Sequence, residues 1–188
     1  MELLETRLQG PLLIAPERFD DERGFFAETY RQSRFAELGV GEAMVQDNHS
    51  RSREGVVRGM HFQIGEGVAK LVRCGRGAIY DVVVDLRRGS PTYGEWEGFR
   101  LDEENLHVLY CPIGFAHGFC TLSEVADVLY KQSNYYSPDT ERGIAFDDAD
   151  VAITWPLPPE RLIISRRDAE APRLAEIADT LPFEYLGS

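Results

Sequence analysis

Short stretches rich in β-branched and aromatic residues recur along the whole sequence, and they limit the fold more than any other feature. Residues 78–86 are the clearest case, because the even-numbered positions are all apolar whereas the odd-numbered ones include Asp81 and Asp85. A period of two is typical of a β-strand with one apolar face and one mixed face. The pattern therefore predicts a fold built mainly of strands.

Similar runs recur at spacings near the interval of about 8–12 residues expected of sandwiches and barrels. We expect strands at residues 12–15, 25–30, 44–48, 56–63, 68–74, 78–86, 96–101, 108–111, 116–122 and 128–133. Helical patterns are confined to residues 31–38, which end at Gly39, and residues 172–178. Many strands with few helices indicate an all-β, double-sheet fold, a jelly roll or a related barrel, with short peripheral helices.

No repeat or linker interrupts the sequence, so we expect one domain over residues 1–188.

Composition narrows the environment and the partners. The net charge of −12 argues against nucleic acid, because that binding depends on Lys and Arg neutralising phosphates. No stretch reaches the ~20 apolar residues of a membrane-spanning helix, and the N-terminus is acidic where a secretory signal would be basic. Three widely spaced cysteines suit reduced thiols. We therefore expect a cytoplasmic protein that binds neither nucleic acid nor a membrane.

Basic residues are concentrated in residues 51–88, which hold eight Lys or Arg and four Asp or Glu, whereas the rest of the chain holds 12 and 28. In an acidic protein such a concentration can form a pocket for a small anion. The alternative is that these residues alternate on solvated strand faces. Within the stretch, Arg58 and Lys70 are the best candidates for a pocket, and we expect Arg87 and Arg88 to be solvated.

One of the expected strands carries both Arg58 and His61. A regular strand would point these two side chains to opposite faces, because they are three residues apart. Gly59 is a plausible site for a β-bulge, which would bring them to one face. The segments that carry Asn48 and Lys70 are expected to be neighbouring strands. Polar groups inside a barrel are costly unless they are paired, so this clustering favours a lined cavity over a lone structural histidine.

A second motif follows near residue 115. It reads Pro-x-Gly-x-x-His, the turn-and-strand signature of the cupin jelly roll, in which Pro112 fixes a dihedral, Gly114 allows a tight turn and His117 enters the barrel. In metal-dependent cupins this histidine joins two others and a Glu, but here the second earlier histidine is replaced by Gln63. Only His61 and His117 remain as plausible imidazole ligands, which is too few for a protein metal site. We therefore expect no metal.

Two further residues gain meaning only in combination with others. Tyr130 lies in an expected strand, and taken alone it is expected to pack in the core with its hydroxyl at the rim. Asp168 follows Arg166 and Arg167, and taken alone it is expected to be a solvated turn residue. It becomes a candidate functional residue only with a histidine to pair with.

Taken together and in this order, the motifs resemble those of the dTDP-4-dehydrorhamnose 3,5-epimerase family of deoxysugar biosynthesis, whose fold is a cupin-type double-stranded β-helix. The resemblance covers nearly the whole chain. It is carried by residues 21–28, 46–50, 58–63, 69–73, 84–87, 112–119, 130–131, 142–144, 155–156 and 165–168. So many short motifs in one order are far more specific than any one of them.

The resemblance implies a set of catalytic roles. His61 is implied to be the base, Asp168 to orient its imidazole, Lys70 to stabilise the enolate at the C4 oxygen, and Tyr130 to return a proton from the opposite face of the ring. The implied reaction converts dTDP-4-dehydro-6-deoxy-D-glucose to dTDP-4-dehydro-L-rhamnose by inversion at C3 and C5. The ketone of the substrate acidifies both positions, so the resemblance implies that neither a metal nor an organic cofactor is required.

The resemblance also implies which residues hold the sugar nucleotide. They are Arg23, Phe26, Glu28, Gln46, Asn48, Arg58, His117 and Arg167. In this family the first three can reach the pocket of a neighbouring subunit, and the family implies a homodimer. Arg167 stands where the family more often has Lys, and a planar guanidinium does not substitute simply for a compact ammonium. The detailed role of Arg167 therefore stays open.

Three alternatives remain open at this point. Some members of the family invert only C3 or only C5, and His61, Lys70, Tyr130 and Asp168 are shared in type by these enzymes. A metal-dependent cupin enzyme is a second class, which the sequence disfavours through Gln63. A non-catalytic sugar-binding cupin is a third, and the presence of a complete base, partner, enolate stabiliser and acid argues against it.

Overall fold

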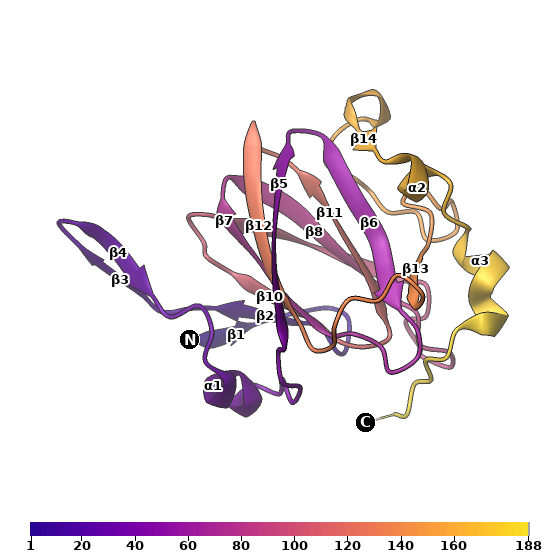
Figure 1. Ribbon diagram of the computed structural model, residues 1–188, viewed down its shortest axis with the longest axis horizontal. Coiled ribbons are helices and arrows are strands. Elements are labelled where there is room, and N and C mark those ends of the chain that lie inside the picture. Colours follow the sequence, from indigo (N-terminus) through magenta and orange to yellow (C-terminus); the bar gives the residue numbers. More distant parts are fainter. Residues whose placement is uncertain (188) are drawn as a thin grey trace.

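Two β-sheets packed face to face form the body of the molecule in the computed structural model, which describes residues 1–187 (Figure 1). The first sheet contains β1 (Glu2–Leu4), β2 (Leu12–Ala15), β5 (Gln46–Arg53), β7 (Lys70–Arg76), β10 (Val108–Cys111) and β12 (Val125–Gln132). The second sheet contains β6 (Val56–Gln63), β8 (Ala78–Asp85), β9 (Trp96–Asp102), β11 (Phe115–Thr121), β13 (Glu141–Gly143) and β14 (Ile163–Ile164).

The strand order is β1-β2-β10-β7-β12-β5 in the first sheet and β13-β6-β11-β8-β9 in the second, where β14 also pairs with β6. Neighbouring strands are antiparallel, except that β14 runs parallel to β6. Strands far apart in sequence therefore lie side by side, as in a jelly roll. The arrangement confirms the predicted all-β fold of the cupin type.

A short hairpin and a few helices lie outside the two sheets. The hairpin is formed by β3 (Arg18–Asp21) and β4 (Gly24–Ala27), and it projects from the body (Figure 1). The helical segments are α1 (Gln32–Glu37), α2 (Arg166–Ala169), α3 (Leu174–Ile177), η1 (Pro159–Arg161) and η2 (Ala178–Thr180). None of the helices within residues 1–187 has the length and apolar character needed to cross a membrane.

Every expected strand has a counterpart, and the prediction for residues 56–63 matches β6 at both ends. The sequence pattern does not predict β1, β3, β13 or β14. Three of these strands have only two or three residues, too few to show a period, and β3 is mostly polar and exposed at all four positions. The two expected helices are present as α1 and α3, both shorter than predicted. Helix α2, which carries Asp168, has four residues and was not predicted.

The two faces of β8 are buried for different reasons. Ile79 and Val83 face the other sheet and belong to the core between the sheets. Val82 and Val84 face outward, where the C-terminal part of the chain covers them. The predicted mixed face is thus the inner one, and it carries Asp81 into the interior with 0% exposure. A polar interior position of this kind indicates a site rather than a simple core.

The expected bulge in β6 is present at Gly59. In the pairing of β6 with β11, His61 lies opposite His117 and Arg58 lies opposite Phe119, so β6 has one extra residue between them. Gly59 has a φ of +143°, and a Cβ atom there would lie 2.5 Å from the Cα of Gly118. Only glycine fits this close approach of two backbones. The bulge turns Arg58 to the same side of the strand as His61.

Candidate active site

His61 and Asp168 form a hydrogen-bonded pair at the edge of the second sheet. His61 lies on β6 and Asp168 on α2, and the distance between Nε2 of the imidazole and Oδ1 of the carboxylate is 2.7 Å. The Ser165 hydroxyl accepts the Asp168 N–H at 3.1 Å and caps the helix. The side chain of Asp168 is 6% exposed and that of His61 is 26% exposed. The pair is therefore anchored from inside and open to a ligand on the histidine side.

Asp168 is charged at neutral pH although it is buried. Burial opposes its ionisation, but the hydrogen bonds from His61 and from the Gly59 N–H outweigh burial and bring the pKa of the carboxyl below its usual value. A carboxylate bound at Nε2 fixes the proton of a neutral imidazole on that nitrogen. Nδ1 is then the ring nitrogen with a free lone pair.

Lys70 places a buried ammonium group beside this pair. Lys70 is the first residue of β7 and is 8% exposed, and its Nζ donates to the main-chain carbonyl of His61 at 3.3 Å. Burial lowers the pKa of Lys70, and the negative charges of Asp81 and Glu141 act in the opposite direction. An ammonium has three donors and this bond uses one. The remaining donors can stabilise an oxygen on which negative charge develops.

A second histidine–carboxylate contact lies deeper between the sheets. His117 on β11 is the cross-strand partner of His61, and its Nε2 lies 2.8 Å from Oδ1 of Asp81 on β8. The two atoms are close, but they are not aligned as a hydrogen bond. Burial lowers the pKa of His117, although the charge of Asp81 opposes the shift. His117 is therefore a neutral imidazole at neutral pH.

Tyr130 approaches the site from the first sheet. It lies on β12 between Asn48 of β5 and Val72 of β7, and its ring packs against the core between the sheets. Burial raises the pKa of Tyr130, and the nearby charge of Glu141 raises it further. Its hydroxyl is therefore protonated at neutral pH and can donate a proton or a hydrogen bond.

Amide side chains line the first sheet next to Tyr130. Gln46 Nε2 donates to Asn48 Oδ1 at 3.0 Å, and Asn48 Nδ2 donates to Gln132 Oε1 at 3.3 Å. The other end of the row is held by the Tyr136 N–H, which donates to Gln46 Oε1 at 2.9 Å. Each amide is thereby fixed in orientation before any ligand arrives, which lowers the entropy cost of binding.

Glu141 links three segments around the edge of the second sheet. It lies on β13, accepts a hydrogen bond from the Tyr136 hydroxyl at 2.8 Å and forms an ion pair with Arg167 at 2.6 Å. Arg167 precedes Asp168, so the ion pair fixes α2 against β13 close to His61. Neither Glu141 nor Tyr136 is among the predicted site residues. Their signal in the sequence is weak, because β13 is only three residues long.

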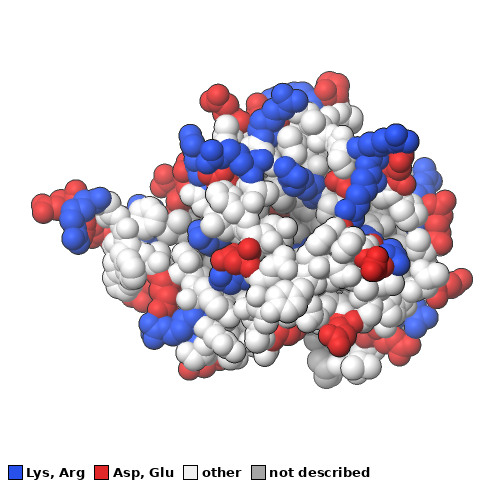
Figure 2. Space-filling view, viewed as in Figure 1, with Lys and Arg blue, Asp and Glu red and all other residues white. Residues whose placement is uncertain are grey.

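Arg58 and the other basic residues of the stretch 51–88 divide into different roles. Arg58 lies on the inner side of β6 and its Nε donates to Ser52 Oγ at 3.1 Å. The face of the molecule seen in Figure 2 has a hollow, and Lys and Arg side chains gather near it. The expectation that Arg87 is solvated is wrong, because its guanidinium binds buried Asp85 at 2.7 Å and lies over the rings of Phe115 and Tyr185. Its charge serves the fold.

Arg23, Phe26 and Glu28 are not brought to the other site residues of their own chain. Arg23 and Phe26 lie on the projecting hairpin and Glu28 just after it (Figure 1). Arg23 pairs with Asp21 next to it in the hairpin, and Glu28 pairs with Arg31. Phe26 is 69% exposed. These three side chains therefore face outward from the protomer.

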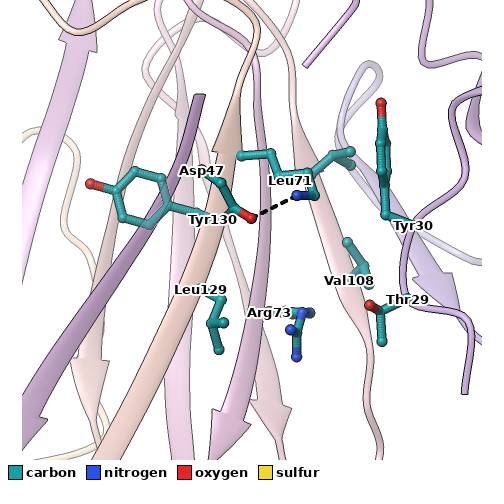
Figure 3. A pocket seen from close by; sticks show the side chains of 9 residues that line it. Thr29, Tyr30, Asp47, Leu71, Arg73, Val108, Leu129 and Tyr130 are labelled. Carbon is teal, nitrogen blue, oxygen red and sulfur yellow. Dashed lines mark hydrogen bonds and ion pairs between the residues drawn. The ribbon is translucent and has the colours of Figure 1, made fainter. Parts of the chain in front are cut away.

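A hollow of about 220 Å³ lies on the outer face of the first sheet. It is bordered by Thr29, Tyr30, Asp47, Leu71, Arg73, Val108, Leu129, Tyr130 and Lys131. Figure 3 shows Tyr130 pointing away from Leu129 and Arg73, because successive residues of β12 face opposite sides of the sheet. The reactive groups around His61 lie on the inner side, so this hollow is separate from the candidate site.

Side chains that could hold a metal are sparse near His61. Within residues 1–187, no group of three or more His, Cys, Asp or Glu side chains has the arrangement of a metal site. The position at which a metal cupin would carry another histidine is occupied by Gln63, which is buried on β6. The two histidines of the site each lie against one carboxylate, His61 against Asp168 and His117 against Asp81.

The fold and the site together define a jelly-roll protein of the cupin class with an ionisable cluster suited to moving protons. The family model described as dTDP-4-dehydrorhamnose 3,5-epimerase matches residues 5–176. The chain belongs to this family of sugar-nucleotide isomerases.

Relatives of known name agree with this assignment. The dTDP-4-dehydrorhamnose 3,5-epimerase of Salmonella typhimurium is 49% identical over 93% of this chain and 96% of the relative. A Legionella pneumophila dTDP-6-deoxy-D-glucose-3,5-epimerase, crystallised with dTDP-4-keto-L-rhamnose, is 42% identical, covers 99% of both chains and has a TM-score of 0.95. The dTDP-4-dehydrorhamnose 3-epimerase of Streptomyces niveus is 45% identical over 95% of this chain and 86% of its own length. The relatives thus include enzymes named as 3,5-epimerases and an enzyme named as a 3-epimerase.

Proposed function

We propose that this protein inverts C3 and C5 of dTDP-4-dehydro-6-deoxy-D-glucose and so produces dTDP-4-dehydro-L-rhamnose. The observation that carries the proposal is the His61–Asp168 pair, with its 2.7 Å contact, beside the buried ammonium of Lys70. Family membership supports the choice of substrate, because the Legionella relative is described with dTDP-4-keto-L-rhamnose bound.

Proton removal begins the reaction at each carbon. Nδ1 of His61 takes the proton from the carbon beside the C4 ketone, and the electron pair of the broken C–H bond moves to the C4 oxygen as an enolate. Asp168 stabilises the imidazolium that forms, as expected for a base oriented by a carboxylate. Lys70 donates to the C4 oxygen and lowers the energy of the enolate.

Proton return completes the inversion. Tyr130 approaches from the first sheet, whereas His61 lies on the second, so the two groups can act on opposite faces of a ring held between them. The Tyr130 hydroxyl gives its proton to the carbon, and the enolate collapses to the ketone. His61 then releases its proton to water and Tyr130 takes one up from water, and repetition at the second carbon yields the doubly inverted sugar.

The remaining inner residues suit the binding of the nucleotide and sugar. Gln46 and Asn48 offer an ordered row of amide groups, and Arg58 and Arg167 offer guanidinium groups for the diphosphate. His117 lies beside His61 as a neutral donor or acceptor. The concentration of basic residues in an acidic protein is consistent with a site for an anionic sugar nucleotide.

The test is an NMR experiment in deuterated water with dTDP-4-dehydro-6-deoxy-D-glucose. Deuterium at both C3 and C5 of the product supports the double epimerase. Deuterium at one carbon would identify a single epimerase, the activity named for the Streptomyces niveus relative. Absence of exchange at both carbons would refute the proposal.

Two variants test the division of roles between His61 and Tyr130. His61→Ala should abolish deuterium exchange at both carbons, because the same base serves each. Tyr130→Phe should impair the return of the proton more than its first removal, so exchange should outlast net inversion. Equal loss of exchange in both variants would contradict the assignment of Tyr130 as the acid.

Metal analysis separates this mechanism from that of a metal-dependent cupin. We expect full turnover after dialysis against a chelator, because His61, Lys70 and Tyr130 supply the base, the oxygen stabiliser and the acid. Stoichiometric iron, manganese or zinc that turnover requires would overturn the mechanism.

We also propose that the protein acts as a homodimer. The hairpin β3–β4 exposes Phe19, Phe25 and Phe26, which are 53%, 50% and 69% exposed. Three large aromatic side chains on a projecting hairpin are unusual for a free surface and suit an interface. A second copy would receive Arg23, Phe26 and Glu28 at its own sugar-nucleotide site.

Mixing two inactive variants tests this arrangement. His61→Ala damages the body of the site, and the double variant Arg23→Ala, Glu28→Ala damages the hairpin side. If sites are shared across a two-fold dimer, mixing after reversible dissociation should restore about a quarter of wild-type activity, because half of the dimers are mixed and each has one intact site. A monomer in light scattering, or no recovery in a confirmed mixed dimer, would contradict the proposal.

A further inference from the structure

Gln63 is a buried polar residue to which the mechanism above gives no part. It is the last residue of β6, two positions after His61, and is 6% exposed. Phe62 lies between them and packs outward against Phe183, with ring centroids 6.0 Å apart. Alternation along the strand therefore places Gln63 on the inner face with His61.

The two ends of the Gln63 amide have different surroundings. Its Nε2 donates to the main-chain carbonyl of Tyr135 at 3.5 Å, which sets the orientation of the amide. Its Oε1 is buried and has no hydrogen-bond partner among residues 1–187. A buried acceptor without a donor lowers the stability of a fold, so such an atom calls for an explanation in the function of the protein.

No donor of the described residues reaches Gln63 Oε1. Glu141 lies directly across from Gln63 on β13, and its carboxylate binds Tyr136 and Arg167. The ammonium of Lys70 donates one of its three N–H bonds to the carbonyl of His61, and neither of the other two reaches Gln63 Oε1. A molecule that enters the site beside His61 can supply the missing donor.

We propose that Gln63 is a specificity-determining residue whose Oε1 accepts a hydrogen bond from a hydroxyl group on the sugar ring, at C2 or C3. The inference rests on the proposed function, because the sugar supplies the donor. A 4-keto-6-deoxyhexose has hydroxyl groups only at these ring carbons once C1 carries the nucleotide. An acceptor two residues from the base fixes the rotation of the ring relative to His61, and it also disfavours sugars that lack the hydroxyl.

The first test replaces the acceptor and keeps the shape. Gln63→Met has a side chain of similar length without an amide oxygen. The variant should lose about tenfold in kcat/KM for deuterium exchange at C5, the effect of one neutral hydrogen bond to the substrate. Its melting temperature should be unchanged or higher, because an unpaired buried acceptor has been removed. A loss of activity that follows a loss of stability would overturn the proposal.

The second test removes the hydroxyl groups of the substrate in turn. The 2-deoxy and 3-deoxy analogues of dTDP-4-dehydro-6-deoxy-D-glucose both retain the C5 proton. Wild type should lose about tenfold in kcat/KM on the analogue that lacks the bonded hydroxyl, and Gln63→Met should lose nothing further on that analogue. An equal effect of Gln63→Met on all three substrates would overturn the proposal.

Thr121→Val provides the matched control. Thr121 has 0% exposure and a hydroxyl oxygen without a partner among residues 1–187, but it lies at the end of β11, four residues after His117. Removal of the Thr121 hydroxyl should leave kcat/KM unchanged on all three substrates. If Gln63→Met does not fold, the analogues decide with wild type alone, because equal kcat/KM on all three sugars excludes a bonded hydroxyl at C2 or C3.

The outcome for Gln63 is separable from that of the proposed function. Wild type that exchanges no deuterium refutes the proposed function and the role of Gln63 together. Wild type that exchanges deuterium normally, together with a Gln63→Met variant of equal kcat/KM, refutes the role of Gln63 alone.

Discussion

Asp85 and Asp168 are both buried carboxylates with lowered pKa values, yet their surroundings differ in one respect. Asp85 is surrounded by permanent donors, namely the Arg87 guanidinium and the hydroxyls of Ser90 and Thr92 at 2.6 to 2.7 Å. Asp168 has a titratable partner, His61, and a weaker contact of 3.5 Å with the Gly59 N–H. A carboxylate with a full set of fixed donors anchors the fold, whereas one bound to an imidazole can respond to a proton.

His61→Gln should have the largest effect on this comparison. The amide keeps a polar group on β6 but cannot accept a proton at neutral pH, so kcat should fall on the order of 10³-fold. The melting temperature should stay close to that of wild type, because the imidazole is partly exposed. NMR of samples quenched at fixed times measures deuterium exchange and hence kcat, and differential scanning calorimetry measures the melting temperature. A kcat within tenfold of wild type would remove His61 from the chemistry.

Asp85→Asn should have the opposite profile. It leaves the Arg87 guanidinium without its carboxylate in a nearly buried position, which should cost about 3 kcal/mol of unfolding free energy. The kcat of the folded protein should not change, because Asp85 has no contact with the reactive cluster. Urea unfolding followed by fluorescence, with kinetics on the folded fraction, measures both. A variant as stable as wild type would show that the Asp85 cluster is not an anchor.

Asp168→Asn tests the second carboxylate of this comparison, the one bound to His61. The amide oxygen still accepts from Nε2–H of His61, but it no longer stabilises a charged imidazolium. Turnover should drop by about 10²-fold, less than for His61→Gln, with a small change in stability. Steady-state kinetics at both carbons provide the measurement, and an effect larger than that of His61→Gln would contradict the assigned order of base and partner.

The difference in acid stability between wild type and Asp85→Asn tests the contribution of Asp85. Burial opposes its ionisation, but the hydrogen bonds from Arg87, Ser90 and Thr92 outweigh burial and lower its pKa. A carboxyl with a lower pKa in the folded state stabilises the fold above its unfolded pKa, about 3.9, and loses that contribution as the pH falls through the folded value. Asp85→Asn should therefore flatten the decline of stability below about pH 4. Equal acid slopes for wild type and variant in pH-dependent calorimetry would refute this.

Arg167→Lys should have the smallest effect. The ammonium keeps a positive charge near Glu141 and keeps the proposed charge contact with the diphosphate, so KM should change by no more than about threefold. Loss of the planar fork should loosen the ion pair with Glu141. A change in KM above tenfold, measured with the natural substrate, would show that the guanidinium geometry matters.

Much of the fold follows from the sequence because strand periodicity is a local property. The period of two in residues 78–86 predicts β8, and the pair Arg58 and His61 with Gly59 between them predicts the bulge in β6. The short strands β13 and β14 are not predicted, because two or three residues show no period. Their pairing depends on contacts with β6 that are distant in sequence.

The site was predictable only in part. The pairing of His61 with Asp168 is implied by the resemblance to the family, and the structure brings the two side chains together across 107 positions of sequence. Asp81 could have been found from its place on the mixed face of β8. Glu141 and Tyr136 could not, because their positions depend on how the chain after β12 folds back on β6.

The close contact between Gly59 and Gly118 has a consequence for how such an enzyme can change over time. A Cβ atom at Gly118 would lie 2.7 Å from the Arg58 carbonyl oxygen, just as one at Gly59 would meet the Gly118 Cα at 2.5 Å. The spacing between the strands of His61 and His117 is thus set by backbone against backbone. Mutations that repack the surrounding core leave this spacing intact, so new sugar specificities can be selected around the two histidines without moving them apart.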